Sequence, residues 1–256
     1  MPTSLPAQVL DRLGDAGARP RLTWYDDEGR VELSGHVAAN WVVKTTNLLC
    51  EELDVEPGVR VVLDLPPHWR TVVWGLAAWR AGASVVIASD RDVLAARPLG
   101  PGDVVVTDRP GAWPTTQAHL VVVTLAALAR RFPGELPAGA VDAASAVMTY
   151  PDRLGLVPDI EPGEPALEAD EQAPVPHHDL AASLRGTVTT PAVGPGERVL
   201  VTAGPATTGT LLATAVLAWS EDASLVVAPQ ALPQDRLDRI ATDEQVTERR
   251  DRPVVP

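Results

Sequence analysis

The sequence predicts an α/β protein with two similar lobes, each built from a mainly parallel sheet with flanking helices, the second lobe being incomplete. The main observation is a repeat, because residues 57–88 and 195–228 share one pattern. Each copy opens with Pro-Gly and continues with an apolar strand, a helix-length stretch, Ala-Ser and a second apolar strand. The strands are unbroken apolar runs, as expected of parallel strands buried on both faces. The connection is long enough for a right-handed crossover.

The composition is that of a folded protein with room for a large core. The chain has 256 residues, of which 45% are hydrophobic and 21% charged, close to ordinary globular values. A net charge of −13 argues against nucleic acid or an anionic membrane surface as partner, since phosphate binding needs clustered Lys and Arg. With no apolar run of membrane-spanning length and no signal peptide, we expect a cytoplasmic protein. Cys50, the single cysteine, forms no internal disulfide and is expected on a helix face.

Three elements precede the first repeat. Residues 5–14 have the apolar spacing of an amphipathic helix that ends at Gly14. Residues 22–25 and 30–33 flank a charged turn and predict a β-hairpin. Ser34 then occupies an N-cap position for a helix that runs to Leu53.

The first lobe is expected to occupy residues 1–150. Its repeat predicts a strand over 59–65, a helix over 68–81 that is apolar around most of its circumference and therefore buried, and a strand over 83–88. Further strands are predicted at 103–107 and 119–124, followed by helices at 125–131 and 139–148.

A change of composition separates the lobes. Residues 151–176 contain six prolines and seven acidic residues, which predicts a linker or surface loop. The partial second lobe follows over 177–241, and a polar tail, expected to fray, occupies 242–256. This lobe offers two clear strands where a stable sheet has about four to six, so we expect it to pack against the first lobe or a partner. Its predicted elements are a helix at 178–188, a strand at 197–202, a helix at 208–219, a strand at 224–228 and a helix at 231–241.

Residues 30–89 resemble the N-terminal part of the adenylate-forming superfamily, which includes acyl-CoA synthetases, luciferases and the adenylation domains of peptide synthetases. A second segment, 178–229, resembles the family region that follows the nucleotide-binding loop. The large domain of that family has two similar α/β lobes, so the resemblance accounts for the repeat. The matching residues are Val-Glu-Leu-Ser at 31–34, Asn-Leu-Leu at 47–49, Val-Glu-Pro-Gly-Val-Arg-Val at 55–61 and Ala-Ala-Trp-Arg-Ala-Gly-Ala at 77–83.

The departures from this family concern its ATP chemistry. The family carries a Ser/Thr/Gly-rich loop ending in lysine, which wraps ATP phosphates, whereas residues 166–176 here contain no glycine, no lysine and three carboxylates. Backbone amides cradle phosphate only where side chains leave room, and carboxylates repel it. The sequence also ends before the family's adenine motif, its ribose-binding aspartate and the C-terminal domain with its catalytic lysine. Lys44, the single lysine, matches neither family lysine and is expected to be solvated on its helix.

The remaining ligand-site candidates lie at two strand-to-helix turns. The turn at 202–210 combines helix N-terminal amides with threonine hydroxyls, an anion-binding arrangement, although capping explains it more simply. It resembles the family segment that borders the acyl-substrate pocket. The turn at 66–70 lies at a strand's carboxyl end, where α/β sheets bind ligands, although a tryptophan there also suits the core. The candidate ligand-binding residues are Thr202, Gly204, Thr207, Thr208, Gly209, Thr210, His68 and Trp69.

Other arrangements of reactive side chains are weak. The segment His177-His178-Asp179 suits a helix start better than a metal site, because adjacent helical residues point in different directions. Asp64 ends the first buried strand without an evident partner, and no Ser-His-Asp pattern or dinucleotide fingerprint is present. We therefore expect no catalytic residue, no metal and no cofactor.

These observations favour a truncated, non-catalytic relative of AMP-dependent synthetases that binds a small acyl or aryl ligand, or a protein partner. The alternative is an acyl-adenylate or acyl-CoA ligase in which a partner chain supplies the missing parts. A third interpretation is a non-functional remnant, which predicts poor solubility because the second sheet would leave unpaired edges. The sequence leaves the oligomeric state open.

Overall fold

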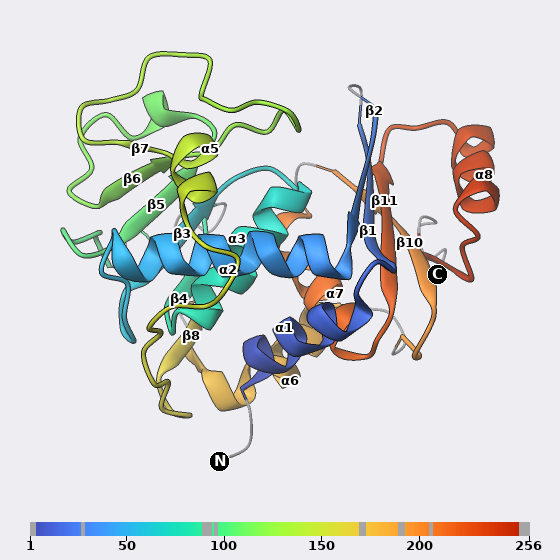
Figure 1. The fold of residues 1–256 in the computed structure, drawn as a ribbon, viewed down its shortest axis with the longest axis horizontal. Helices are drawn as coiled ribbons and strands as arrows, with labels where there is room; N and C mark the ends of the chain where they lie inside the picture. The colour runs from blue at the N-terminus through green and yellow to red at the C-terminus, as the bar shows by residue number, and fades with distance from the viewer. Residues whose placement is uncertain are drawn as a thin grey trace.

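Two β-sheets lie at opposite ends of the molecule and share a central layer of helices (Figure 1). The structure is a computed structural model, which describes residues 4–26, 29–88, 94, 97–168, 173–188, 193–204 and 207–250. One apolar core joins the inner faces of both sheets to these helices, and smaller apolar clusters cover the outer faces. The helices that pack together in the central layer are α1 (Leu5–Ala16), α2 (Gly35–Glu51), α3 (Trp69–Arg80) and α7 (Thr208–Ser220).

The first sheet has seven strands, all parallel to their neighbours except for an antiparallel hairpin at one edge. Its central strands are buried on both faces, as the unbroken apolar runs predict. In spatial order the strands are β7 (Val141–Asp142), β6 (His119–Val122), β5 (Val104–Thr107), β3 (Arg60–Asp64), β4 (Ser84–Ile87), β8 (Pro165–Glu168) and β9 (Val175–Pro176).

The second sheet has five strands in the order β12, β10, β11, β1, β2, and again only the last pair is antiparallel. These relationships match those of β5, β3, β4, β8 and β9 in the first sheet, strand for strand. The predicted α/β class with two mainly parallel sheets is therefore confirmed. The strands are β12 (Glu248–Arg250), β10 (Arg198–Ala203), β11 (Ser224–Pro229), β1 (Pro20–Asp26) and β2 (Gly29–Ser34).

Two tryptophans occupy corresponding places in the repeats and support this correspondence. The Trp79 indole N–H donates to the carbonyl of Ala166 in β8 at 2.7 Å. Its counterpart Trp219 donates to the carbonyl of Arg21 in β1 at 3.0 Å. Both side chains are buried at the end of a crossover helix, so each repeat uses an indole to fix the strand beside its second strand.

The expectation that the second sheet has two strands is wrong. The N-terminal hairpin, which the sequence places with the first lobe, pairs through β1 with β11. Leu22, Thr23 and Trp24 are all buried, so β1 is an interior strand rather than the edge of an isolated hairpin. Local sequence patterns identify a strand but contain no information about which distant strand it joins.

Two segments expected to be irregular also contain strands. The stretch 151–176 is a loop only as far as Glu164, and then supplies β8 and β9. The tail supplies β12, which pairs with β10, while its last six residues lie outside the described range. Prolines at the strand ends and charged residues at the sheet edge hide these short strands from a composition-based prediction.

Most predicted helices are present, with shifted ends. Ser34 caps α2 by accepting the Val37 N–H at 3.3 Å. Helix α1 continues past Gly14 and ends at Gly17, whose φ of +57° suits glycine. The predicted helix at 139–148 is a short α5 that follows β7. The remaining helical elements are α5 (Ala143–Ala146), α6 (Leu180–Thr187), α8 (Gln234–Asp243) and the 3₁₀ turns η1 (Pro110–Ala112), η2 (Val147–Thr149) and η3 (His177–Asp179).

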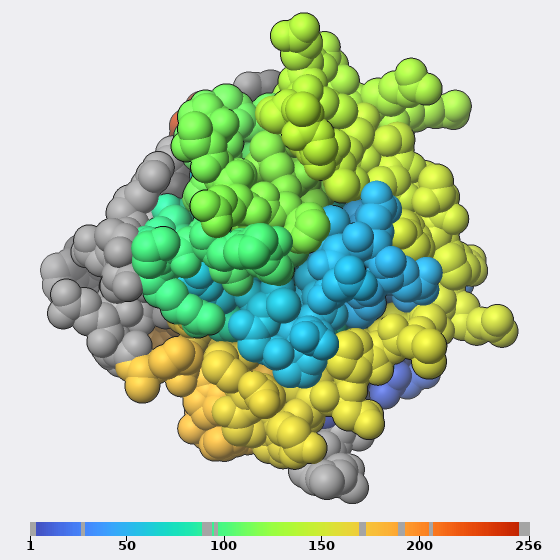
Figure 2. All heavy atoms as spheres, turned by 90° about the vertical axis from the view of Figure 1, so that its left-hand side faces the viewer, coloured from blue at the N-terminus to red at the C-terminus, as the bar shows by residue number. Residues whose placement is uncertain are grey.

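The predicted helix at 125–131 is not formed. The Leu128 side chain is 95% exposed, so the apolar face of that pattern has nothing to pack against, and helices depend on such packing. The segment from 125 to 160 instead lies along the top and right of the face shown in Figure 2. Among the described residues, no helix is sufficiently long and apolar to cross a membrane.

Candidate functional site

A large cleft lies where strands of both sheets end. It has a volume of about 530 Å³ and is bordered by the carboxyl ends of β3, β4, β10 and β11 and by the first residue of α7. This is the edge at which open α/β sheets bind ligands. The two repeats contribute equivalent strand ends, so the duplication itself creates the cleft. Its lining includes Trp24, Leu63, Asp64, Pro66, Pro67, Ile87, Asp108, Arg109, Ala203, Gly204, Thr208 and Pro229.

Asp64 is not the isolated acid that the sequence indicates. Its buried carboxylate accepts hydrogen bonds from the Thr107 hydroxyl at 2.8 Å and from the Trp113 indole at 2.8 Å. The Arg109 guanidinium forms a third bond and an ion pair with it. These donors hold the loop that follows β5 against the end of β3. The carboxylate therefore has few acceptor positions left for a ligand.

Asp108 is a second acid that lines the cleft. Its Oδ1 is buried and has no hydrogen-bond partner in the described part of the chain, although the Arg109 Nε lies 3.8 Å away. Burial raises the pKa of this carboxyl above its usual value. Because this oxygen is itself enclosed by the protein, it is not exposed to a ligand in the open cleft.

The threonine turn between β10 and α7 largely satisfies its own hydrogen bonds. The Thr207 hydroxyl accepts the Gly204 N–H at 3.0 Å and donates to the Gly204 carbonyl at 2.8 Å. The Thr208 hydroxyl donates to the carbonyl of Leu65 at 3.4 Å. Residues 205 and 206 lie outside the described range. The bonds formed by Thr207 are those expected of a structural turn.

Some of the candidate ligand-binding residues in this turn line the cleft and others do not. Gly204 and Thr208 are buried and line the cleft. Thr202 and Gly209 are half-buried beside it, whereas Thr210 is exposed. Of the six candidates from this turn, the structure brings two to the cleft.

His68 begins α3 as its N-cap and lies behind one wall of the cleft. Its Nδ1 accepts the Arg70 N–H at 3.2 Å, and its ring packs edge-on to Trp24 with the centroids 4.9 Å apart. Burial, assisted by the Arg70 guanidinium, lowers the pKa of His68 to about 3. The ring is thus neutral and supports Trp24 without reaching the cleft.

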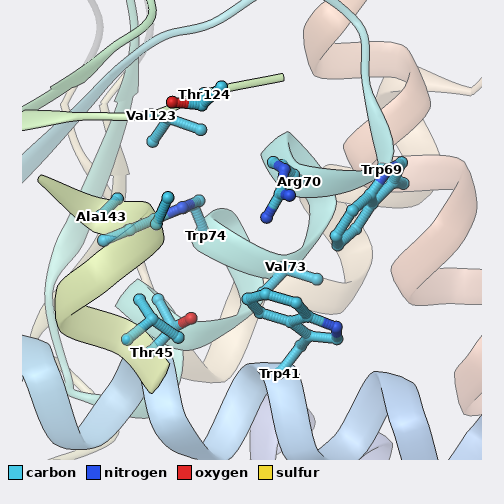
Figure 3. Close-up of a pocket in the computed structure, with 11 residues that line it drawn as sticks. Trp41, Thr45, Trp69, Arg70, Val73, Trp74, Val123, Thr124 and Ala143 are labelled. Atoms are coloured by element: carbon cyan, nitrogen blue, oxygen red, sulfur yellow. The ribbon is translucent and has the colours of Figure 1, made fainter. Parts of the chain in front are cut away.

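Trp69 faces a different cavity. It is 3% exposed and packs edge-on to Trp41 with the ring centroids 5.5 Å apart. With Arg70 it lines a small cavity between α2, α3, α5 and the end of β6 (Figure 3). Of the two adjacent candidates, Trp69 lines this cavity and His68 lines neither the cavity nor the cleft.

Lys44 is not solvated as the sequence predicts. It is half-buried in α2, and its Nζ donates to the carbonyl of Tyr150, so the loop after η2 covers it. Cys50 is half-buried on the same helix, and burial raises the pKa of its thiol to about 11, which keeps it protonated. Within the described residues no three His, Cys, Asp or Glu side chains gather as metal ligands would.

The segment in the place of the family's phosphate loop forms the β8–β9 hairpin. Glu168, at the end of β8, is buried and pairs with Arg97 at 3.0 Å. Residues 169–172 lie outside the described range. The last described residue of β8 is thus a carboxylate that is already paired with an arginine.

This fold is that of the N-terminal part of adenylate-forming enzymes. The N-terminal subdomain of Klebsiella oxytoca NpsA matches with a TM-score of 0.65 at 16% identity, over 96% of this chain and 60% of that one. A Mycobacterium tuberculosis fatty acyl CoA synthetase matches with a TM-score of 0.63 at 13% identity, over 95% of this chain and 48% of that one. The amide bond synthetase McbA from Marinactinospora thermotolerans matches with a TM-score of 0.68 at 14% identity, over 96% of this chain and 48% of that one. The chain thus spans about half of these structures.

Sequence comparison identifies the family. No family model matches the sequence. The chain is 34% identical over 249 residues to a TIGR03089 family protein of Mycobacterium tuberculosis, covering 95% of this chain and 97% of that protein. The chain belongs to this family.

Proposed function

We propose that the protein binds a small acyl or aryl ligand in the cleft between its two sheets and does not adenylate it. The cleft of about 530 Å³ at the carboxyl ends of β3, β4, β10 and β11 is the observation that carries the proposal. Pockets of this size with largely apolar walls and few polar groups are typical of small-molecule sites.

The lining of the cleft favours a ligand with an apolar body and one polar end. Trp24, Ile87 and Pro229 supply apolar walls from three different strands. The polar side chains of the lining are Asp64, Asp108, Arg109 and Thr208. A planar or aliphatic group between the apolar walls, with its polar end directed to these side chains, suits the lining.

The hairpin at β8–β9 supports the absence of adenylation. Residues 166–176 have no glycine to bend closely around a phosphate and no lysine to balance its charge. Their carboxylates would repel ATP, and Glu168 is held in place by Arg97. The composition of this segment therefore argues against a phosphate-binding loop.

The second candidate is a ligase completed by a partner chain. Its basis is the fold, which this chain shares with 43% of the fused NpsA-ThdA di-domain and 60% of the NpsA N-terminal subdomain. In this case the cleft is half of an active site, and a second polypeptide contributes the nucleotide site.

Ligand binding can be tested by titrating the purified protein with benzoate-type and short acyl acids and amides while recording amide NMR spectra. We expect shifts centred on Gly204, Thr208 and Asp108. Ala203→Phe, which fills the cleft, abolishes them, whereas the matched surface variant Ala138→Phe retains them. Unchanged spectra at millimolar ligand would overturn the binding proposal.

Adenylation is tested separately by ATP–pyrophosphate exchange with the same acids. We expect no exchange by the chain alone. Exchange by the purified chain contradicts the proposal, and exchange only after adding a co-purifying protein favours the second candidate.

A further inference from the structure

The edges of the two sheets differ in their capacity to pair with another strand. The four edge strands are β7 and β9 in the first sheet and β12 and β2 in the second. In the described part of the chain, β7 and β9 have two residues each and β12 has three, and β9 ends in Pro176, which has no N–H to donate. Short edge strands and prolines keep sheets from pairing edge to edge. Strand β2 has six residues and no proline, so among the described strands it is the edge that can accept a further strand.

Strand β2 is fixed on one side and open on the other. It pairs with β1 along its whole length, from Gly29 to Ser34, and no further strand of the described chain lies beyond it. Val31 and Leu33 pack towards the core, whereas the side chains of Arg30 and Glu32 are 42% and 35% exposed. The edge therefore has a defined conformation before any partner binds.

The sequence of β2 is complementary to itself in one register. When two copies of a strand pair antiparallel about a two-fold axis at one residue, the residue before it lies opposite the residue after it in the other copy. An axis at Val31 places Arg30 of each copy opposite Glu32 of the other, and it places the two Val31 side chains opposite each other. Opposite charges and β-branched residues at directly facing positions both stabilise a strand pair.

Neighbouring registers are disfavoured by the same charges. An axis at Arg30 places two arginines opposite each other, and an axis at Glu32 does the same with two carboxylates. Like charges at facing positions are destabilising. Arg30 also keeps its ion pair of 2.7 Å with Glu244 of its own chain. The charges that protect an edge against unrelated strands therefore favour one partner, which is the same strand of a second copy.

We propose that two copies of this chain associate through β2, antiparallel and with the two-fold axis at Val31, so that their five-stranded sheets form one continuous sheet. Such a contact uses the same surface on both copies and closes at two of them. The contact is small, since each copy contributes one strand, so the dimer is expected to dissociate on dilution. No residue of β2 lines the cleft, so the dimer is independent of the function proposed above.

The oligomeric state is tested by sedimentation equilibrium over a wide range of protein concentration. We expect the average mass of the wild type to rise with concentration from that of one chain towards that of two. Glu32→Arg, which places arginines opposite arginines, is expected to weaken the association at least tenfold. The matched change Glu135→Arg, at an exposed loop position, is expected to leave it unchanged. A wild type that stays monomeric at millimolar concentration, or an equal effect of the two variants, would overturn the proposal.

A mixing experiment tests the register. Arg30→Glu is also expected to weaken self-association, because carboxylates then face carboxylates. In an equal mixture of Arg30→Glu and Glu32→Arg, each arginine of one variant lies opposite a glutamate of the other, so we expect mixed dimers where neither variant associates alone. A dimeric wild type without mixed dimers contradicts the register at Val31.

Hydrogen exchange of the wild type locates the contact without any variant, and it decides the matter if Arg30→Glu does not fold. Amides that become hydrogen-bonded in a strand pair exchange more slowly. We expect the exchange of β2 amides to slow as the protein concentration rises, and that of the other second-sheet edge, β12, to stay the same. A dimer that slows exchange elsewhere and leaves β2 unchanged contradicts the inference.

Discussion

Arg60 and Asp103 are joined by both side chain and backbone at the start of the first sheet. The Arg60 Nη2 lies 2.6 Å from the Asp103 Oδ2, and Oδ1 accepts the Arg60 backbone N–H at 3.1 Å. The guanidinium, 1% exposed, also donates to the carbonyls of Arg97 and Pro98 at 2.6 and 2.7 Å. One arginine thus fixes the start of β3 to the start of β5 and to the loop before it.

The second repeat contains the same device with a different acid. Arg198 corresponds to Arg60 in the repeat, and its Nη2 lies 2.6 Å from Glu244, which precedes β12. Glu244 also binds Arg30 at 2.7 Å and accepts the Tyr25 hydroxyl at 2.6 Å. Strand β12 lies beside β10 in the second sheet, as β5 lies beside β3 in the first. In each repeat, therefore, an arginine on the first strand pairs with an acid that precedes the neighbouring strand.

The two arginines predict unequal losses of stability. Arg60→Met leaves Asp103 with backbone donors alone, and we expect the free energy of unfolding to fall by about 3 kcal/mol, the size expected for one partner of a buried pair. Arg198→Met leaves Glu244 paired with Arg30 and is expected to cost about 1.5 kcal/mol. Urea denaturation measures both. Equal losses would contradict the argument that Arg30 compensates.

The close approach of α3 and α7 in the central layer predicts a coupled pair. A Cβ at Gly75 would lie 2.7 Å from both Leu212 methyl carbons, so Gly75→Ala overpacks the helix crossing and is expected to cost about 2 kcal/mol. Leu212→Ala creates a cavity and is expected to cost about 3 kcal/mol.

The test of this pair is a double-mutant cycle. The double variant is expected to lose less than the sum of the single losses, because the new methyl group enters the space that Leu212 leaves. Gly111→Ala, at an open surface position, is the control for adding a methyl group. Strict additivity would show that the two positions do not share the contact.

The sequence reveals the repeated units because their information is local. Apolar strands, the Pro-Gly turn and the capping Ser34 are each visible within about one element, and the structure confirms the strands and the crossover helices. The pairing of β1 with β11 is not visible because it joins residues about 200 apart, and no local pattern determines such a partner. Strand β12 is not visible in the sequence either, because its pairing with β10 is also distant and its charged residues Glu248 and Arg250 are typical of a solvated tail.

The site could be predicted only in outline. The carboxyl ends of the first strand in each repeat identify the edge where the cleft forms, and Gly204 and Thr208 lie in it. Asp108 and Arg109 were missed because they follow a strand outside the repeat. The small cavity beside Arg70 was also missed, since it depends on how α2, α3 and α5 pack together, and a sequence shows residues rather than contacts. Trp69 lies in the other cavity and His68 supports Trp24, and their adjacency in the sequence does not distinguish these positions.

Helix α8 offers a stabilising substitution. Gln245 follows the end of this helix with a φ of +53°, a conformation that costs a side-chain-bearing residue about 1 kcal/mol. The side chain is exposed. Gln245→Gly is therefore expected to raise the free energy of unfolding by about 0.5 kcal/mol after the greater freedom of glycine in the unfolded chain is subtracted. Gly139→Gln, the reverse change at a φ of +79°, is expected to destabilise, and the opposite signs would contradict the strain argument.

The buried His68 predicts a loss of stability in mild acid. Its pKa is lowered from 6.5 to about 3 in the folded protein, so between these values the unfolded chain binds a proton that the folded state excludes. The stabilisation is present above pH 6.5 and is lost as the pH falls towards 3, with a slope from this one group of up to about 1.4 kcal/mol per pH unit. His68→Asn keeps an acceptor for the Arg70 N–H and removes the titrating ring, and is expected to flatten the profile of unfolding free energy between pH 6 and 4. Exposed His119 supplies the control, His119→Asn, which is expected to leave that slope in place. An unchanged slope in His68→Asn would show that the ring behind Trp24 accepts a proton without unfolding the first turn of α3.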